Sequence, residues 1–169
     1  TPANVSQLAP QWTFQAGVGG QFEATPVVLD GMLYVSGPQS HAWAIDGRTG
    51  RQVWHYQRTL PAGLKVCCGP VNRGLAVYGN KLFMTTLDAH LVALDMKTGK
   101  QLWKKPFANH LEGYKGVSAP LIANGVMITG TSGGEHATRG FLVGWDPETG
   151  NELWRKHMIP APGEPGHET

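Results

Sequence analysis

The chain has 169 residues, 41% of them hydrophobic and 15% charged, a composition that suits one folded core and excludes a disordered segment. The formal net charge of +2 comes from dispersed lysines and arginines, which gives no basis for nucleic-acid binding. The apolar runs are too short for a helix that crosses a bilayer. The 23 glycines, 12 prolines and 6 tryptophans indicate a turn-rich chain of many short strands.

The predicted elements begin with a leading strand over residues 8–16, which contains Trp12. Three hairpin signals follow, and in each of them two apolar runs are joined by Asp-Gly, Gly-Asn or Asn-Gly, which are typical of tight β-turns. These hairpins cover residues 27–35, 75–84 and 121–129. After each hairpin we expect a third strand, a turn and a fourth strand. The predicted four-stranded units span residues 22–58, 71–105 and 116–157, and a connecting tail follows over residues 158–169.

One motif, small-x-Asp-x-x-Thr-Gly-x-x-x-Trp, recurs in all three units. Its aspartates, Asp46, Asp95 and Asp146, are 49 and 51 positions apart. The aspartate suits a turn because its carboxylate can accept hydrogen bonds from the backbone, and the glycine tolerates a positive φ. Trp12 is consistent with the end of a fourth copy, and the third copy differs from the others by having Gly144 in place of alanine.

A period of about 50 residues with four strands per repeat is typical of a β-propeller blade. A flat meander or a sandwich is the alternative, but tryptophans at a fixed spacing favour the propeller. The sequence therefore predicts an all-β chain that forms a partial β-propeller of about three four-stranded antiparallel blades. Closed propellers have roughly four to eight blades, so such an arc would leave strand edges and apolar faces uncovered. We expect the chain either to belong to a longer protein, which the tail favours, or to assemble with copies of itself.

Cys67 and Cys68 are the only cysteines, and they are adjacent. A disulfide between neighbours closes almost no loop, so it would hold the local backbone rigid rather than stabilise the whole fold. Two reduced thiols and one half of a metal site are the alternatives that these residues leave open.

The tryptophan repeats, together with Cys67-Cys68 shortly before Arg73, resemble the pyrroloquinoline quinone (PQQ)-dependent alcohol dehydrogenases, the quinoprotein methanol and ethanol dehydrogenase family. The resemblance covers essentially the whole chain. It implies an eight-bladed parent propeller, of which this chain would be an N-terminal fragment of about three blades.

The resemblance implies a role for four residues around the quinone. Cys67 and Cys68 would form a vicinal disulfide against one face of PQQ, in an oxidising compartment. Arg73 would donate to the quinone oxygens, since its planar and permanently charged fork suits an oxygen that gains negative charge on reduction. Glu23 would lie near the cofactor.

A second group of residues would bind a PQQ carboxylate and the metal. Ser132, Gly133 and Gly134 match the family's carboxylate-binding stretch, and Glu135 matches a calcium ligand, in keeping with the oxygen donors that calcium requires. Val117 departs from the pattern, because a cofactor-binding threonine is expected there; the serine that follows it is a candidate substitute. Taken singly, such residues are also compatible with solvated charges and an ordinary glycine loop. Their joint occurrence favours a cofactor site.

By resemblance, the parent reaction is the oxidation of a primary alcohol by hydride transfer to PQQ, assisted by calcium or by a lanthanide in its place. The implied partners are a small alcohol and cytochrome c or another electron acceptor, and the implied location is the periplasm. The catalytic base, the other calcium ligands and the tryptophan beneath PQQ would lie in later blades. We therefore expect no catalytic residue in this chain, and little or no activity from it alone.

A non-catalytic propeller scaffold is the alternative class of function. Scaffolds need the tryptophan repeats but have no use for Cys-Cys-x-x-x-x-Arg or Ser-Gly-Gly-Glu, so these motifs favour the enzyme. Self-association is a related alternative, in which homo-oligomers bury the open blade edges.

Overall fold

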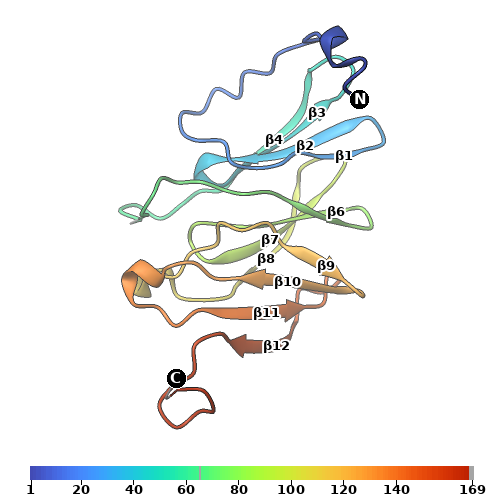
Figure 1. Ribbon diagram of the computed structural model, residues 1–169. Helices are drawn as coiled ribbons and strands as arrows, with labels where there is room; N and C mark the ends of the chain where they lie inside the picture. The colour runs from blue at the N-terminus through green and yellow to red at the C-terminus, as the bar shows by residue number, and fades with distance from the viewer. Residues whose placement is uncertain (65, 168–169) are drawn as a thin grey trace.

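The computed structural model describes residues 1–64 and 66–167, which form three four-stranded antiparallel sheets stacked one on another (Figure 1). The strands of each sheet pair in chain order. The first sheet contains β1 (Val27–Leu29), β2 (Met32–Gly37), β3 (His41–Asp46) and β4 (Gln52–Gln57). The second contains β5 (Ala76–Tyr78), β6 (Lys81–Thr85), β7 (His90–Asp95) and β8 (Gln101–Pro106). The third contains β9 (Leu121–Ala123), β10 (Val126–Gly130), β11 (Phe141–Trp145) and β12 (Glu152–His157). The predicted all-β partial propeller is confirmed.

Short 3-10 helices are the remaining regular elements of the described chain: η1 (Val5–Gln7), η2 (Pro38–Ser40), η3 (His110–Glu112) and η4 (Gly134–His136). None of the helices in this part of the chain has the length and apolar character needed to cross a membrane. The predicted tail follows β12, and Arg139 ties it to the third sheet by donating from Nε to the carbonyl of Ile159 (2.6 Å) and by pairing with Glu164. The last two residues of that predicted tail lie outside the described residues.

The hairpin turns follow from residues that accept a positive φ. Asp30 and Gly31 join β1 to β2 with φ of 50° and 77°, and Asn124 and Gly125 join β9 to β10 with φ of 48° and 76°. Two successive residues with positive φ are the signature of the type I′ turn, whose twist matches that of the paired strands. In the turn between β5 and β6 only Gly79 has a positive φ, of 58°, as the first central residue of a type II′ turn does. All three predicted hairpins are confirmed.

The motif aspartates organise the turns between the third and fourth strands. Asp46 Oδ1 accepts hydrogen bonds from the backbone N–H groups two and three residues later, both at 2.9 Å, and Gly50 closes the turn with φ of 71°. Equivalent contacts recur at Asp95 and Asp146. Hydrogen bonds from the motif threonine are the main reason that the pKa of each carboxylate lies below its ordinary value.

The docking tryptophans join each blade to the next. Trp54 Nε1 donates to the carbonyl of Met96 (3.0 Å), and a Cβ on Gly99 would lie only 2.6 Å from the indole ring. Gly99 is therefore needed both for its φ of 70° and for the close approach of the ring. Trp12 repeats this contact on the first sheet by donating to the carbonyl of Gly47 (3.0 Å). The interpretation of Trp12 as the end of a fourth copy is confirmed.

The leading strand predicted over residues 8–16 is not formed. This segment is extended, but no strand of the described chain pairs with it. It crosses the outer face of the first sheet instead, where Phe14 meets the ring of Trp43 edge-to-face at 6.2 Å between centroids. An extended segment becomes a strand only when a neighbour takes up its backbone hydrogen bonds, and here side-chain docking holds it without one.

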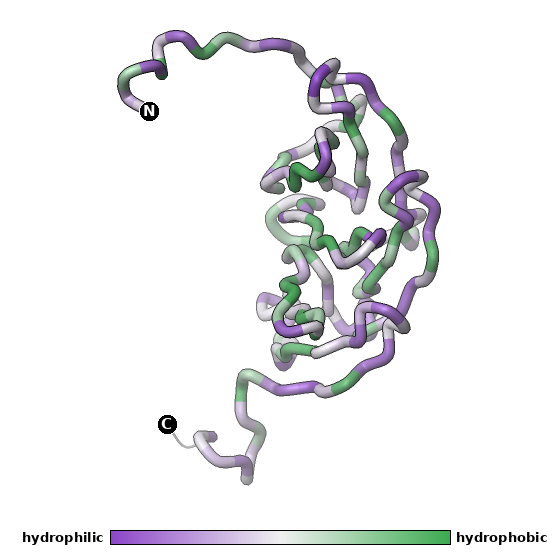
Figure 2. Tube along the Cα trace, turned by 90° about the vertical axis from the view of Figure 1, so that its right-hand side faces the viewer, coloured by the Kyte–Doolittle hydropathy of each residue, from purple (hydrophilic) through white to green (hydrophobic). Residues whose placement is uncertain are grey.

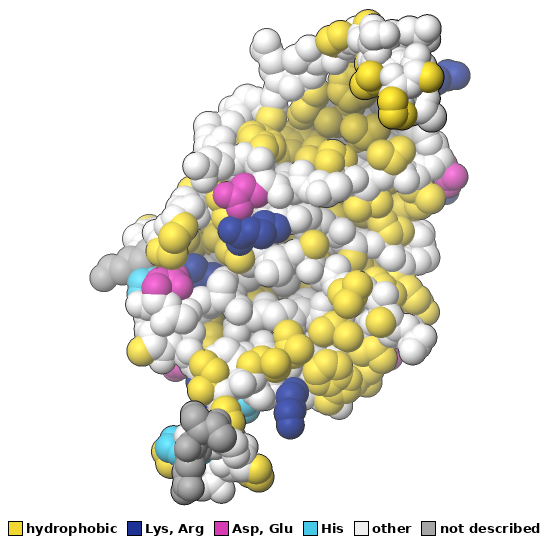
Figure 3. Space-filling view, viewed as in Figure 1, with side chains coloured by type: hydrophobic (Ala, Val, Ile, Leu, Met, Phe, Trp, Pro, Cys, Tyr) yellow, Lys and Arg dark blue, Asp and Glu magenta, His cyan; other side chains and the backbone are white. Residues whose placement is uncertain are grey.

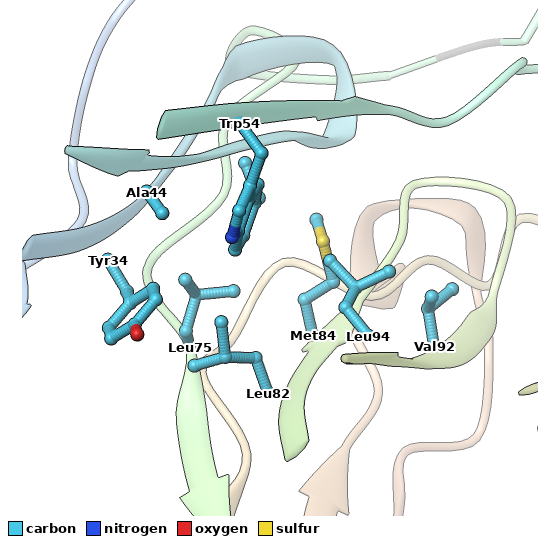
Figure 4. Close-up of a cluster of buried hydrophobic side chains, with 9 residues drawn as sticks. Tyr34, Ala44, Trp54, Leu75, Leu82, Met84, Val92 and Leu94 are labelled. Carbon is cyan, nitrogen blue, oxygen red and sulfur yellow. The ribbon is translucent and has the colours of Figure 1, made fainter. Parts of the chain in front are cut away.

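Two apolar clusters fill the spaces between the blades. Figure 4 shows the first cluster, in which Tyr34 and Trp54 of the first blade reach toward Leu75 and Leu82 of the second. The second cluster packs the second blade against the third, around Met127. The core therefore lies between sheets rather than inside any one of them, as expected for propeller blades.

The two ends of the stack keep apolar side chains exposed (Figure 3). Along the trace, hydrophobic and hydrophilic residues are interspersed (Figure 2). Val28 is exposed on the first blade, and Leu121 is exposed on the third. Trp154, the docking tryptophan of the third blade, is 40% exposed. Its ring folds back over Gly144, where a Cβ would lie 2.1 Å from the indole. The uncovered faces expected of an arc of blades are thus present.

Candidate functional site

The predicted site residues lie on loops that meet at the junctions of the blades. Glu23 precedes β1, Arg73 precedes β5 and Val117 precedes β9, so each stands just before the first strand of its blade. Because all three blades have the same strand order and are stacked, the loops that precede their first strands lie next to one another. The backbone N–H of Arg73 donates to the carbonyl of Val117 at 2.8 Å, which ties the second loop directly to the third.

Arg73 and Glu23 form an ion pair between the first and second blades. Arg73 Nη2 lies 2.9 Å from Glu23 Oε2, and both side chains remain partly exposed. Figure 3 shows acidic and basic side chains adjacent on this face of the molecule. The guanidinium is therefore positioned by a carboxylate while part of its fork stays accessible to a ligand. Two of the four residues predicted to lie around the quinone, Glu23 and Arg73, are thus brought together.

Asn72 positions Arg73, and the sequence-based prediction missed it. Its side chain is buried, with Nδ2 donating to the carbonyl of Thr85 (2.8 Å) and Oδ1 accepting from the N–H of Gly74 (3.1 Å). Because both the nitrogen and the oxygen of this buried amide have partners, Asn72 fixes the backbone next to Arg73. An asparagine in a loop next to a charged residue and close to a glycine is usually solvated, so no signal in the sequence marked this one as buried.

Cys67 and Cys68 lie at the surface as free cysteines, with their Sγ atoms 2.6 Å apart. The disulfide that the resemblance implies is thus not formed in this structure and stays a prediction for the oxidised protein. A hydrogen bond with Cys68, followed by burial and a hydrogen bond with Glu135, raises the pKa of the Cys67 thiol to about 11. Its contact with Glu135 brings the cysteine loop to the 132–135 segment.

The 132–135 segment is held by a short backbone bridge. Lys115 and Ser132 exchange both of their backbone hydrogen bonds at 3.0 Å, and Ser132 Oγ also donates to the carbonyl of Lys115 (3.2 Å). Gly133 has φ of 130°, and a Cβ there would lie 2.4 Å from the carbonyl oxygen of Gly113. Only glycine fits at this position, which explains the glycine in the predicted carboxylate-binding stretch.

Glu135 is paired with a buried lysine that the sequence-based prediction did not include. Lys115 Nζ lies 2.8 Å from Glu135 Oε1, and Lys115 is 4% exposed. The hydrogen bond from Lys115 is the main cause that lowers the pKa of Glu135 to about 2. His136 Nε2 lies 3.6 Å from the same oxygen. Lysine side chains are mostly exposed, so the burial of Lys115 could not be predicted from the sequence.

A cavity of about 460 Å³ opens beside this ion pair. Its walls are the 61–64 segment, which leads to the cysteines, and the turn at 110–113, with His136 at the border with Glu135. The cavity therefore adjoins the residues expected to bind the cofactor, and its lining is partly apolar and partly polar.

Comparison with known proteins identifies the family. The family described as glucose/ethanol/alcohol dehydrogenase, beta-propeller domain, of the PQQ type, matches residues 1–169. The chain belongs to this family. It is 44% identical to the quinoprotein alcohol dehydrogenase PedH of Pseudomonas putida, over 92% of this chain and 27% of that protein. It spans about a quarter of the length of the curated relatives that it matches.

Solved structures agree with this membership of the PQQ dehydrogenase family. The quinohemoprotein alcohol dehydrogenase of Comamonas testosteroni superposes with a TM-score of 0.85 at 39% identity, over 96% of this chain and 25% of that one. A europium-containing methanol dehydrogenase superposes with a TM-score of 0.84 at 35% identity, over 94% of this chain and 28% of that one. The resemblance stated from the motifs is confirmed.

The donor set of this PQQ-family chain fits an anionic quinone. Arg73 and Lys115 supply positive charge, Ser132 supplies a hydroxyl, and a Cβ on Gly134 would meet nothing within 4 Å, so that side of the loop is open. Glu135 offers a carboxylate to a metal, but the described residues contain no cluster of three His, Cys, Asp or Glu side chains that would hold one. Calcium takes about six to eight oxygen ligands, so most of them would come from the cofactor or from elsewhere.

Proposed function

We propose that this chain is the N-terminal part of a PQQ- and calcium-dependent alcohol dehydrogenase that oxidises primary alcohols. The observation that carries the proposal is the convergence of three segments, at 67–73, 115–117 and 132–135. The hydrogen bond from Arg73 N–H to the carbonyl of Val117 joins the first to the second, and the backbone bridge between Lys115 and Ser132 joins the second to the third. Membership of the family supports PQQ as the cofactor, and a lanthanide in place of calcium is an outcome that metal titration distinguishes.

The role of each residue follows from its position. PQQ would supply the hydride acceptor when bound. Arg73, steadied by Glu23 and Asn72, would donate to a quinone oxygen and stabilise negative charge there. Ser132 and the backbone of Gly133 and Gly134 would hold a carboxylate. Glu135 would contribute one oxygen to calcium.

The rest of the enzyme would supply what this chain does not. We assign no general base to the chain. We expect the parent protein to act on a small alcohol, to pass electrons to an acceptor such as cytochrome c, and to be located in the periplasm. The 169-residue chain alone should therefore bind PQQ without turning over alcohol.

The test separates binding from catalysis. PQQ is dialysed to equilibrium against the purified chain with calcium, and alcohol-dependent dye reduction is measured in parallel. We expect saturable binding that weakens about 100-fold in Arg73→Ala, since a charge-assisted hydrogen bond contributes roughly 1.5–3 kcal/mol. Arg48→Ala, in the first motif turn away from these loops, is the matched control. Equal binding by Arg73→Ala and wild type, or robust alcohol oxidation by the chain alone, would contradict the proposal.

Self-association is a second candidate, because apolar side chains at both ends of the stack are exposed. Light scattering across a concentration series tests it. Growth of the apparent mass with concentration is expected if arcs associate, and a constant monomer mass would refute it.

A further inference from the structure

A buried lysine lies beside the loop that the proposed function assigns to the cofactor. Lys115 is 4% exposed, and its backbone is fixed by two 3.0 Å hydrogen bonds with Ser132. Its ammonium donates to Glu135 Oε1 at 2.8 Å and to the carbonyl of Gly113 at 3.4 Å. An ammonium has three N–H donors, and no third acceptor is recorded for it within residues 1–64 and 66–167. The ammonium can therefore donate a further hydrogen bond to an oxygen of a ligand.

The ion pair also occupies the carboxylate that a metal would need. A metal ion and the Lys115 ammonium are both cations, so they would compete for the same oxygen of Glu135. Metal at Glu135 would repel the ammonium, which would then be a buried charge without its counter-ion. Such a charge is strongly unfavourable unless an anion replaces the lost partner.

The Lys115 ammonium lies close to the loop proposed to hold a carboxylate of the quinone. The bridge between Lys115 and Ser132 keeps the lysine backbone beside the loop proposed to hold a quinone carboxylate. A lysine side chain has a flexible four-carbon stem and acts as a point charge, so rotation of the side chain alone can redirect it. Gly134 leaves the space beside this loop open.

We infer that Lys115 is an anion-binding residue for a carboxylate of the quinone. Its ion pair with Glu135 masks it, meaning that the ammonium is not available to an anion until a metal ion coordinates Glu135. The inference rests on the proposed function. It makes metal and quinone bind cooperatively, because the metal releases the ammonium and the ammonium then holds the carboxylate. Lys115 is thus a further cofactor-binding residue, and Glu135 has a second role as its counter-ion in the empty site.

The test removes the negative charge of Glu135 by substitution, in the absence of any metal. PQQ affinity is measured by equilibrium dialysis in EDTA at one fixed pH for wild type, Glu135→Gln, Lys115→Met and the double variant. We expect Glu135→Gln to bind PQQ about 10-fold more tightly than wild type, within the usual range of coupling between sites. The double variant should bind PQQ about 10-fold more weakly than Glu135→Gln, because the released ammonium is then absent. In the Lys115→Met background, Glu135→Gln should change the affinity by less than about twofold. Lys104→Met, at an exposed lysine of β8, controls for the loss of one positive charge.

The outcomes separate this inference from the proposed function. Equal tightening by Glu135→Gln with and without Lys115 would show general charge repulsion and overturn the inference. Equal affinity of Glu135→Gln and the double variant would overturn it as well, while PQQ binding by wild type would still support the proposed function. Failure of every protein to bind PQQ would overturn both. Circular dichroism checks folding, and Lys115→Gln replaces Lys115→Met if the latter is unfolded.

Discussion

Trp54→Ala tests how strongly a docking tryptophan joins two blades. Trp54 is 8% exposed, its ring covers Gly99, and its indole N–H donates to the carbonyl of Met96 at 3.0 Å. Truncation to alanine would open a cavity between the first and second blades and leave that carbonyl without its partner.

The size of the effect follows from burial. Replacing a buried tryptophan by alanine typically costs about 3–5 kcal/mol, so we expect the free energy of unfolding to fall by about 4 kcal/mol. For a chain of this length, that loss lowers the melting temperature by roughly 8–16 °C. A loss of this size is a large share of the roughly 5–15 kcal/mol that stabilises a typical domain.

Trp154→Ala is the matched control, because Trp154 occupies the same motif position but is 40% exposed. Its removal should cost less than about 1 kcal/mol. Urea unfolding followed by far-ultraviolet circular dichroism measures both variants without depending on tryptophan fluorescence. Equal losses at positions 54 and 154 would refute the conclusion that contact with the next blade, and not the motif itself, provides the stabilisation.

Three further predictions concern buried polar groups. Asn72→Ala should lower the free energy of unfolding, measured in urea, by about 1–3 kcal/mol, because a buried backbone carbonyl loses its hydrogen bond. Arg58→Met should lower it by about 3 kcal/mol, because the buried Asp88 carboxylate loses a guanidinium 2.5 Å away. Stability should also fall as the pH is lowered below about 6.5, because burial lowers the pKa of His41 and of His55 and folding therefore favours their neutral forms.

Each of these predictions has its own control. Asp88→Asn in the Arg58→Met background should recover part of the loss, and no recovery would contradict the role assigned to the unpaired charge. For the histidines, urea midpoints at pH 7.5 and 5.5 are compared with those of His55→Gln, in which the pH dependence should be smaller. A wild-type midpoint that does not change with pH would contradict the assignment. An Asn72→Ala variant as stable as wild type would show that solvent replaces the lost hydrogen bond.

Much of the fold was predictable because its signals are local. Asp-Gly and Asn-Gly turns carry their backbone conformation in their own chemistry, and so does the Asp-x-x-Thr-Gly turn at Asp46. The period of the motif then indicated blades. The segment over 8–16 was predicted wrongly as a strand, because strand pairing depends on a distant partner that local residues do not reveal.

The site divides in the same way. Arg73, Glu23 and the glycines of residues 132–135 were found from motifs, and the fold brings them to adjoining loops. The partners that position them were not foreseen. Asn72 and Lys115 are polar residues whose side chains bond to Thr85 and Glu135, 13 and 20 residues further along the chain. Their burial therefore depends on the folded arrangement rather than on any short stretch of residues. Turn chemistry and repeat spacing thus specify each blade, whereas the pairing of charges between blades arises only when the sheets stack.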